Sequence, residues 1–245
     1  MDTGRYLDRI KYPGKTVPSL ETLRELQHCH LLNVPFENLD IHLKKPIELD
    51  VDKLYNKIVL EKRGGFCYEL NGLFIELLLQ LGFKAKRISA RVFSENDRYG
   101  AEYDHLAIIV DIDAAEYLVD VGFGEFAFSP LKLTTGSVMH DPRGDFIFEK
   151  YQDEYLRVSK VVDEKRTPQY IFKNIPRAFE EFGQMCLYHQ TSPDSHFTQN
   201  RIISRPTPNG RISLTGNKLK ITDGNSVEEI QLETEAAFRS SLAEY

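Results

Sequence analysis

Apolar residues recur at helical spacing directly after a glycine pair and a cysteine in the first third of the chain. From Leu70 to Leu81 they fall at positions i, i+3, i+4, i+7 and i+8, which is the spacing of one buried helix face. Gly82 follows, and glycine favours the end of a helix. The pattern therefore predicts a buried helix whose first turn begins near Cys67.

The pattern stays helical over most of the residues before position 84. A short amphipathic helix is expected before Pro13, and another helix over about residues 50–61. Ser19 is a favourable N-cap for a leucine-rich helix that we expect to end at Pro35. Residues 1–84 are therefore predicted to form a helical bundle.

From about residue 84 the period of the pattern changes to two. Short alternating runs, separated by Asp, Asn and Gly clusters, are typical of antiparallel strands and of a barrel or sandwich built from hairpins. The expected strands are 84–93, 103–111, 116–122, 145–151, 154–161 and 168–173.

The last part of the chain mixes both periods. A helix is expected at about 177–189, a polar run at 192–200, strands at 201–206, 211–214, 218–222 and 227–232, and a helix at 233–243. The whole pattern predicts an α+β fold with no internal repeat.

Composition narrows the class of protein. The 245 residues carry a formal net charge of −6 with scattered Lys and Arg, so we expect neither a nucleic-acid surface nor a membrane surface. No apolar run reaches the roughly 20 residues that span a bilayer, and the N-terminus shows no signal-peptide pattern. Three cysteines without a close pair favour a reducing, cytoplasmic setting over a disulfide framework.

Cys67 is the first candidate for chemistry. A cysteine at a helix N-terminus meets unpaired N–H groups and the positive end of the helix dipole, which favour the nucleophilic thiolate. Gly64 and Gly65 would leave the preceding backbone uncrowded for a substrate. The alternative is a buried structural cysteine, so the catalytic interpretation requires a base and an orienting acid elsewhere in the chain.

His105 and Asp120 are the candidate partners, on two strands joined by a short loop. If Asp111 pairs with Glu116 across a four-residue loop, His105 and Asp120 are diagonal neighbours on one sheet face. A two-residue loop would place them directly opposite each other. Asp120 stands in an otherwise apolar run, where a carboxylate is costly to bury unless it is paired.

Together, Cys67, His105 and Asp120 have the residue types of a nucleophile, its base and an orienting acid. A His–Asp pair alone could be purely structural, but the cysteine favours the catalytic interpretation. The chain order, with the cysteine on a helix and the other two on adjacent strands, is a papain-like or transglutaminase-like arrangement. It predicts acyl transfer through a thioester.

The run His28-Cys29-His30 contains three residues of metal-ligating types and is therefore a candidate metal site. Consecutive helix positions point in divergent directions, and no second ligand pair is spaced to complete a tetrahedron. We therefore expect no metal. Cys186 is expected in the core, on one face of the helix at 177–189.

The chain resembles the arylamine N-acetyltransferases over essentially its whole length. The segments that carry the resemblance are Val34-Pro35-Phe36-Glu37-Asn38-Leu39, Arg63-Gly64-Gly65-Phe66-Cys67-Tyr68-Glu69-Leu70-Asn71, Asp104-His105-Leu106, Val119-Asp120-Val121-Gly122-Phe123-Gly124, and Ser192-Pro193 with Ser195-His196-Phe197-Thr198.

The resemblance implies three parts: a helical bundle over 1–84 that carries the nucleophile, a central antiparallel β-barrel over 85–185 that carries His105 and Asp120, and an α/β lid over 186–245. It implies a ping-pong reaction in which acetyl-CoA acylates Cys67 and an arylamine or arylhydrazine takes the acetyl group. N-hydroxyarylamines would be O-acetylated. The protein would be a monomer or small homo-oligomer.

Further residues are implied by the resemblance alone. Phe36, Tyr68 and Phe123 would contact the acceptor, where an aromatic ring can stack. The acetyl-CoA side would be lined by Gly124 and by the segment Ser195, His196, Phe197 and Thr198. Without the resemblance, Gly124 would be interpreted as part of an ordinary turn, and residues 195–198 would be interpreted as a polar linker with helix caps.

Arg63 and Glu69 would support the triad through ion pairs and hydrogen bonds. The chain ends at Glu244-Tyr245, where the resemblance implies a few more residues of terminal helix, so the resemblance leaves the CoA affinity and the shape of the cleft open, but not the triad.

Three other functions use the same residues differently. An amide synthase of this fold would use another thioester donor, a cysteine amidase or peptidase would admit water and an extended peptide, and a binding protein would keep only a relic of the site.

Overall fold

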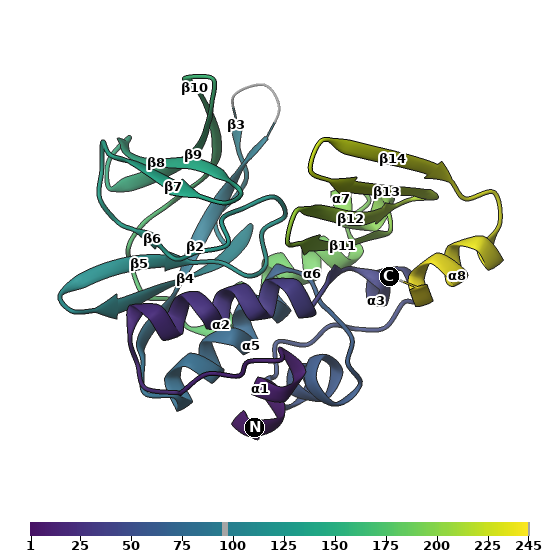
Figure 1. The fold of residues 1–245 in the computed structure, drawn as a ribbon, viewed down its shortest axis with the longest axis horizontal. Coiled ribbons are helices and arrows are strands. Elements are labelled where there is room, and N and C mark those ends of the chain that lie inside the picture. The colour runs from purple at the N-terminus through teal and green to yellow at the C-terminus, as the bar shows by residue number, and fades with distance from the viewer. Residues whose placement is uncertain (95–97, 245) are drawn as a thin grey trace.

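Helices dominate the first eighty residues of the computed structural model, which describes residues 1–94 and 98–244 (Figure 1). Their bounds are α1 (Thr3–Arg9), α2 (Leu20–Asn33), α3 (Leu39–His42), α4 (Val51–Tyr55) with a π-helical turn at Asn56–Leu60, and α5 (Cys67–Gln80). Ser19 caps α2 as expected, because its side chain accepts a hydrogen bond from the Thr22 N–H. The helix ends at Asn33 rather than at Pro35, since the residue before a proline is held extended.

The helix α5 lies at the centre of this bundle and is buried on nearly every side. The expected apolar face is in the core, and Cys67 opens the helix as predicted. Gly82 adopts a φ of +88°, which confirms the glycine stop.

The middle of the chain forms one nine-stranded antiparallel sheet that curls into a nearly closed barrel. Its main path runs β6-β5-β4-β2-β10-β9-β8-β7, with β3 paired to β2. The strands are β2 (Lys84–Ser94), β3 (Arg98–Tyr99), β4 (His105–Ile112), β5 (Ala115–Val119), β6 (Leu131–Lys132), β7 (Val138–Asp141), β8 (Gly144–Tyr151), β9 (Tyr155–Val162) and β10 (Lys165–Phe172). The short strands β3, β6 and β7 were not predicted, because two to four residues are too few to show a period.

The β4–β5 hairpin has the register in which Asp111 faces Glu116. A further pair, Ile112 with Ala115, tightens the connection to the two residues Asp113 and Ala114, both with positive φ. The strand expected at 116–122 ends at Val119, so Asp120 lies just past the ladder rather than in it. The register nevertheless brings the end of β5 beside the start of β4.

The C-terminal part is a five-stranded antiparallel sheet with helices beside it, in the order β1-β11-β12-β13-β14. Its elements are β11 (Ile202–Thr207), β12 (Gly210–Thr215), β13 (Lys218–Asp223), β14 (Ser226–Gln231) and α8 (Glu235–Glu244). A 3-10 turn (Phe179–Phe182), α6 (Gly183–Thr191) and α7 (His196–Gln199) connect it to the barrel. We call β11–β14 with β1 the lid sheet.

The edge strand β1 (Phe36–Glu37) comes from the N-terminal segment, not from the lid. It pairs with β11 on one side, and Phe36 forms an isolated bridge with Gly65 on the other. The lid sheet is therefore joined by backbone hydrogen bonds to the loop just before Cys67.

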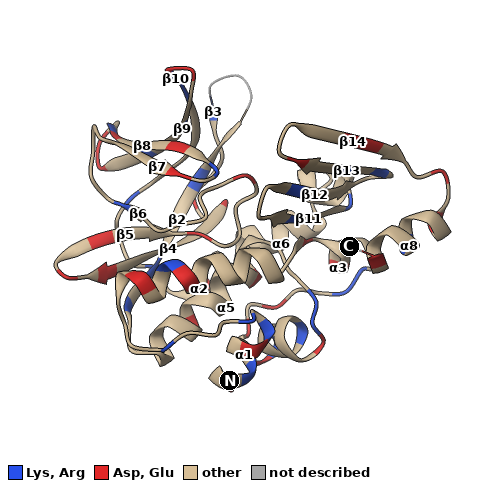
Figure 2. Cartoon of the chain, viewed as in Figure 1, with Lys and Arg blue, Asp and Glu red and all other residues tan. Residues whose placement is uncertain are grey.

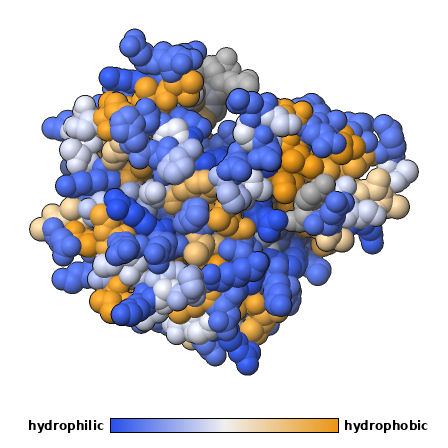
Figure 3. Space-filling model, in the orientation of Figure 1, coloured by the Kyte–Doolittle hydropathy of each residue, from blue (hydrophilic) through white to orange (hydrophobic). Residues whose placement is uncertain are grey.

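Charges of both signs are interspersed over the elements (Figure 2), and polar residues cover most of the face in Figure 3 with small apolar areas between them. Across residues 1–94 and 98–244, no helix has the length and apolar character to cross a bilayer.

Candidate active site

Cys67 is the first residue of α5 and is only 3% exposed. The residue before it, Phe66, has an extended backbone, and its N–H donates to the Glu69 carboxylate at 3.0 Å. This contact fixes the start of the helix, where unpaired N–H groups lie beside the thiol.

The glycines before Cys67 differ from expectation. Both are buried, and a Cβ on Gly64 would lie 2.0 Å from the Pro35 carbonyl oxygen. A Cβ on Gly65 would meet the Glu69 side chain at 2.8 Å. The missing side chains thus let the protein's own backbone pack closely, rather than leaving space for a substrate.

His105 and Asp120 form a buried pair. The Nε2 atom of His105 lies 2.7 Å from Oδ2 of Asp120, and both side chains are almost fully excluded from solvent. Because a carboxylate only accepts hydrogen bonds, this contact assigns the proton to Nε2 and leaves Nδ1 as the accepting nitrogen of the neutral ring. This is the arrangement that a proton-accepting imidazole needs.

Three further donors hold the Asp120 carboxylate. The Asn71 Nδ2 atom donates to Oδ1 at 2.8 Å, the Gly122 N–H donates to the same oxygen at 2.9 Å, and the Tyr170 hydroxyl donates to Oδ2 at 3.0 Å. A buried carboxylate with this many donors is oriented firmly and does not need a cation to compensate its burial.

Asn71 was not singled out from the sequence, although it lies within the segment that carries the family resemblance. Its side chain also donates to the Leu106 carbonyl at 2.7 Å and accepts from the Val121 N–H at 2.9 Å. It therefore connects α5 to the start of β4 and to the segment after β5. The sequence signal that could have identified Asn71 is a polar residue one helical turn after Cys67, on a helix predicted to be buried.

The cysteine and the His–Asp pair are brought together by a close backbone approach. A Cβ on Gly122 would lie 2.8 Å from the Cys67 Cα and 2.9 Å from the Asn71 Nδ2. Only glycine allows the segment after Asp120 to lie against the first turn of α5. The three candidate catalytic residues thus share one small region of the protein.

Deprotonation of the Cys67 thiol needs this proximity. Burial raises the pKa of the Cys67 thiol well above its ordinary value, and the carboxylates of Asp104 and Asp120 raise it further. The helix N-terminus alone therefore does not produce a thiolate here, contrary to the simplest sequence argument. A nucleophilic sulfur at this position requires a neighbouring group to take its proton.

A buried ion network lies behind the cysteine loop. Arg63 contacts Asp40 at 2.6 Å and Glu37 at 2.8 Å, and Lys57 contacts Glu69 at 2.7 Å. Lys57 also reaches Asp40 at 2.9 Å. Arg63 and Glu69 therefore form ion pairs of the kind expected. The network also includes Glu37, Asp40 and Lys57, which were not predicted to support the triad.

Glu69 has a second function in this network. Burial raises the pKa of its carboxyl to about 7 although Lys57 opposes the shift. One oxygen accepts from Lys57 and the other from the Phe66 N–H. The network is thereby connected to the backbone that immediately precedes the nucleophile.

Aromatic rings surround the approach to the triad. The Phe123 ring lies 5.1 Å from the His105 ring, edge to face, and the Phe36 ring lies 6.0 Å from that of Phe197. A narrow opening of about 20 Å³ is lined by Phe36, Phe123 and Gly124, with Arg211 from the lid at its edge. Phe36, Phe123 and Gly124 thus line one opening, and Phe197 packs on Phe36 without lining it.

Tyr68 has a different environment from the other expected acceptor contacts. It is fully buried, and its hydroxyl donates to the carbonyls of Tyr103 and Asp104 at 2.7 and 3.0 Å. This side chain offers no surface to a bound molecule. It instead fixes the backbone that leads into His105.

The segment expected beside the cofactor forms the short helix α7. Ser195 is buried and caps that helix, with its Oγ 3.1 Å from the His189 Nδ1. The Thr198 hydroxyl donates to the Ser192 and Ser195 carbonyls. Of this segment, the ring of His196 is the exposed one, and it packs edge to face on Phe197.

The side chains of residues 28–30 lie in three different environments. His30 is fully buried between the Tyr6 and Phe74 rings, whereas His28 packs against Phe128. Cys29 is partly exposed. Among the residues that the structure describes, no group of three or more His, Cys, Asp or Glu is arranged to hold a metal ion.

Comparison with known proteins agrees with this geometry. The model of an N-acetyltransferase family matches residues 19–245. The arylamine N-acetyltransferase pineal gland isozyme NAT-3 of Gallus gallus is 34% identical, with 100% of this chain and 93% of the relative covered. The arylamine N-acetyltransferase of Mycolicibacterium smegmatis is also 34% identical, covering 96% of this chain and 88% of the relative.

Solved structures show the same fold. The arylamine N-acetyltransferase of M. tuberculosis superposes with a TM-score of 0.92 at 32% identity, over 99% of this chain and 92% of that one. The Mycobacterium marinum enzyme in complex with CoA gives 0.91 at 32% identity, over 99% and 91%. The chain therefore belongs to the arylamine N-acetyltransferase family and is an acyltransferase.

Proposed function

We propose that this protein transfers an acetyl group from acetyl-CoA to the nitrogen of aromatic amines and hydrazines through an S-acetyl-Cys67 intermediate. The observation that carries this proposal is the buried His105–Asp120 pair, held against the first turn of the helix that begins with Cys67. Family membership supports the reaction class, and the related structure of the M. marinum enzyme contains CoA.

His105 would move the protons of both half-reactions. Its Nδ1 accepts the Cys67 thiol proton as the sulfur attacks the thioester carbonyl, and it returns that proton to the departing CoA sulfur. The acceptor amine then attacks the S-acetyl carbon, its proton passes to His105, and the C–S bond breaks to regenerate Cys67. Asp120 fixes the ring through Nε2 and stabilises the imidazolium.

The acceptor would enter through the aromatic opening. Phe36 and Phe123 present ring surface there, and Phe197 backs Phe36, so a planar aromatic amine finds stacking partners next to His105. The same position would allow the hydroxyl oxygen of an N-hydroxyarylamine to take the acetyl group. At about 20 Å³ the opening is smaller than an aromatic ring, so its lining side chains would have to move apart for the acceptor to enter.

The donor would lie along the barrel–lid side of the same opening. A groove of about 630 Å³ there is lined by the cations Arg143, Lys160 and Arg211 and by the acids Glu125 and Asp223. Arg211 donates to the Gly124 carbonyl and to Ser204, and burial followed by the charge of Arg143 lowers the pKa of its guanidinium to about 10. These three cations would bind the phosphates of CoA, and the family resemblance would add Gly124 and His196 to the contacts of the donor.

Intact-protein mass spectrometry after incubation with acetyl-CoA and no amine tests the proposal. One added acetyl group, mapped to Cys67 and released by an aromatic amine, is the expected result. Cys67→Ala should gain no acetyl group while keeping its thermal unfolding transition. Full transfer activity in folded Cys67→Ala would overturn the proposal.

The same experiment separates the related activities. A hydrolase would lose the acetyl group to water without an amine, and an amide synthase would ignore acetyl-CoA but accept a larger thioester. All three cysteines are free, which supports a reducing cytoplasmic location.

A further inference from the structure

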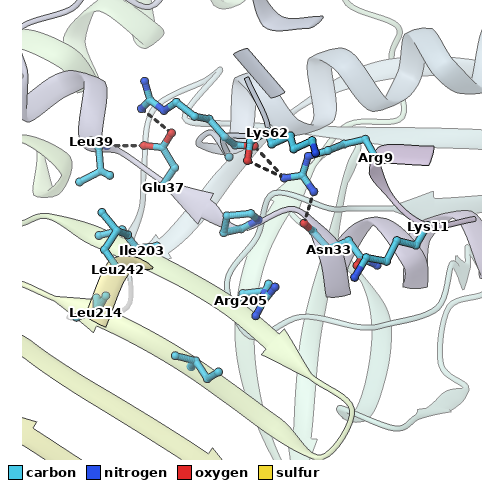
Figure 4. A pocket seen from close by; sticks show the side chains of 14 residues that line it. Arg9, Lys11, Asn33, Glu37, Leu39, Lys62, Ile203, Arg205, Leu214 and Leu242 are labelled. Carbon is cyan, nitrogen blue, oxygen red and sulfur yellow. Dashed lines mark hydrogen bonds and ion pairs between the residues drawn. The ribbon is translucent and has the colours of Figure 1, made fainter. Parts of the chain in front are cut away.

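A second pocket, of about 600 Å³, lies between the helical bundle and the lid sheet (Figure 4). Its bundle side carries Arg9 and Lys62, and its lid side carries Arg205 and Leu214 from the neighbouring strands β11 and β12. The volume is within the range of small-molecule sites. Neither the triad nor Phe36 or Phe123 lines it.

This pocket lies on the opposite face of the lid sheet from the aromatic opening. Ser204 of β11 lines that opening, and the next residue, Arg205, lines the second pocket. Successive side chains of a strand point to opposite faces, so the two cavities are separated by the sheet itself. The second pocket is therefore distinct from the acyl-transfer site.

The charge of the pocket is strongly positive in a protein whose net charge is −6. Five of its lining residues are cations: Arg9, Lys11, Lys62, Arg63 and Arg205. The single acid among the lining residues is Glu37, which is already paired with Arg63 at 2.8 Å. Within residues 1–94 and 98–244, Arg205, Lys11 and Lys62 have no carboxylate within ion-pair distance.

Arg9 is held in place by backbone carbonyls, and no carboxylate of residues 1–94 and 98–244 lies within ion-pair distance of it. Its guanidinium donates four hydrogen bonds, to the backbone carbonyls of Ile58, Asn33, Lys62 and Arg63. Carbonyl dipoles orient it but leave its full charge uncompensated. Burial lowers the pKa of the Arg9 guanidinium, Tyr6 opposes this shift, and the positive charge of Arg205 lowers the pKa further.

Arg205 occupies a position where the fold alone would favour an apolar residue. Ile203 and Ile212 share its face of the sheet, since Arg205 pairs with Ile212 and Ile203 pairs with Leu214. A partly buried cation on an apolar sheet face, facing another uncompensated cation, is unfavourable unless an anion joins them. Charge and apolar surface are thus presented side by side.

We propose that this pocket binds a small amphipathic anion, whose carboxylate, sulfonate or phosphate group lies between Arg205 and Arg9 and whose apolar body lies on Ile203, Ile212 and Leu214. Lys11 and Lys62 add to the positive field at the rim. The ligand supplies a counter-charge to these cations.

Titration with the fluorescent naphthalenesulfonate 8-anilino-1-naphthalenesulfonate tests this site. We expect saturable binding of one probe molecule per chain that is displaced by decanoate and weakened by added salt. Arg205→Leu, which suits an apolar sheet face and should fold, should weaken probe binding about tenfold or more, equal to about 1.4 kcal/mol. Lys220→Leu is the matched control, because Lys220 pairs with Ser213 on the other face of the sheet.

Two results would overturn the proposal: equal probe affinity in Arg205→Leu and the unaltered protein, or displacement of the Arg205-dependent probe by CoA. The second would mean that the pocket is part of the donor site. Acetylation of Cys67 by acetyl-CoA is measured on the same samples. Because no catalytic residue lines the pocket, Arg205→Leu should acetylate normally, so failure of this proposal is distinguishable from failure of the acyl-transfer proposal.

Discussion

Gly122 and Cys67 are in direct backbone contact: a Cβ added to Gly122 would lie 2.8 Å from the Cys67 Cα. The first turn of α5 and the segment after Asp120 thus have a fixed separation. Any side chain between them must move either the nucleophile or the His–Asp pair. From the sequence, Gly122 was only the last residue of an expected strand, whereas its effect on the site comes from the packing of two distant segments.

Gly122→Ala should therefore impair catalysis more than its size suggests. Overpacking of this kind typically costs about 1–3 kcal/mol of unfolding free energy, and a displaced thiol should reduce kcat/KM by about a hundredfold. Acetyl-transfer kinetics and thermal unfolding measure the two effects. Gly183→Ala is the control, since a Cβ there meets no atom within 4 Å; equal effects of both variants would refute the close-contact argument.

Asn71→Leu should separate the three segments that the amide joins. The substitution removes one donor from the Asp120 carboxylate, the donor to the Leu106 carbonyl and the acceptor of the Val121 N–H. Loss of such buried partners costs about 1–3 kcal/mol each, so unfolding by urea should show a clear destabilisation. Because Asp120 loses orientation, kcat should fall while the KM for the amine changes little. A stable variant with unchanged kcat would exclude the positioning role.

The reactivity of Cys67 should depend on His105. Because burial raises the pKa of the thiol, a protein without the imidazole should be alkylated by iodoacetamide at alkaline pH and poorly at pH 7. With His105 present, proton transfer to the ring should make alkylation at pH 7 about a hundredfold faster. The measurement is the pH profile of Cys67 alkylation in Cys29→Ser protein, with and without His105→Asn. Superimposable profiles would contradict an activating role for His105.

Acid should destabilise the protein through His30. Burial, followed by the charge of Arg9, lowers the pKa of this imidazole from 6.5 to about 3. Between those values the unfolded chain binds a proton that the folded protein does not, so the free energy of unfolding falls as pH falls below about 6.5. The slope from this one group approaches 1.4 kcal/mol per pH unit.

His30→Phe should flatten that slope, because phenylalanine keeps the contacts with the Tyr6 and Phe74 rings and cannot titrate. Urea unfolding at several pH values between 4.5 and 7 is the measurement. His196→Phe, at an exposed ring on the lid side, is the control and should leave the slope as it is. If His30→Phe has the same slope as the unaltered protein, His30 is not the acid-sensitive group.

The sequence predicted the elements whose period repeats and missed those held by distant contacts. The parity argument placed His105 and Asp120 on neighbouring strands, and the Asp111–Glu116 register confirmed the pairing it assumed. It could not show that the strand stops at Val119, because the stop depends on hydrogen bonds from Gly122 and Asn71 to the Asp120 side chain.

The site residues carried over by family resemblance behave unequally for the same reason. Phe123 stands beside His105, whereas Tyr68 is turned into the core and donates to the backbone before His105. The resemblance gave both the same role, contact with the acceptor. Only the tertiary contacts decide which aromatic ring faces a cavity.

The two-residue strand β1 limits how far the three parts of the protein are independent modules. Phe36 and Glu37 complete the edge of the lid sheet through β11 and also contact the loop before Cys67. A lid expressed alone would expose the unpaired edge of β11, and a chain shortened before the lid would leave β1 without its ladder. Exchange of lids between relatives therefore has to include residues 36–37 to preserve the sheet. The structural unit of the lid is thus made of two segments that are far apart in the sequence.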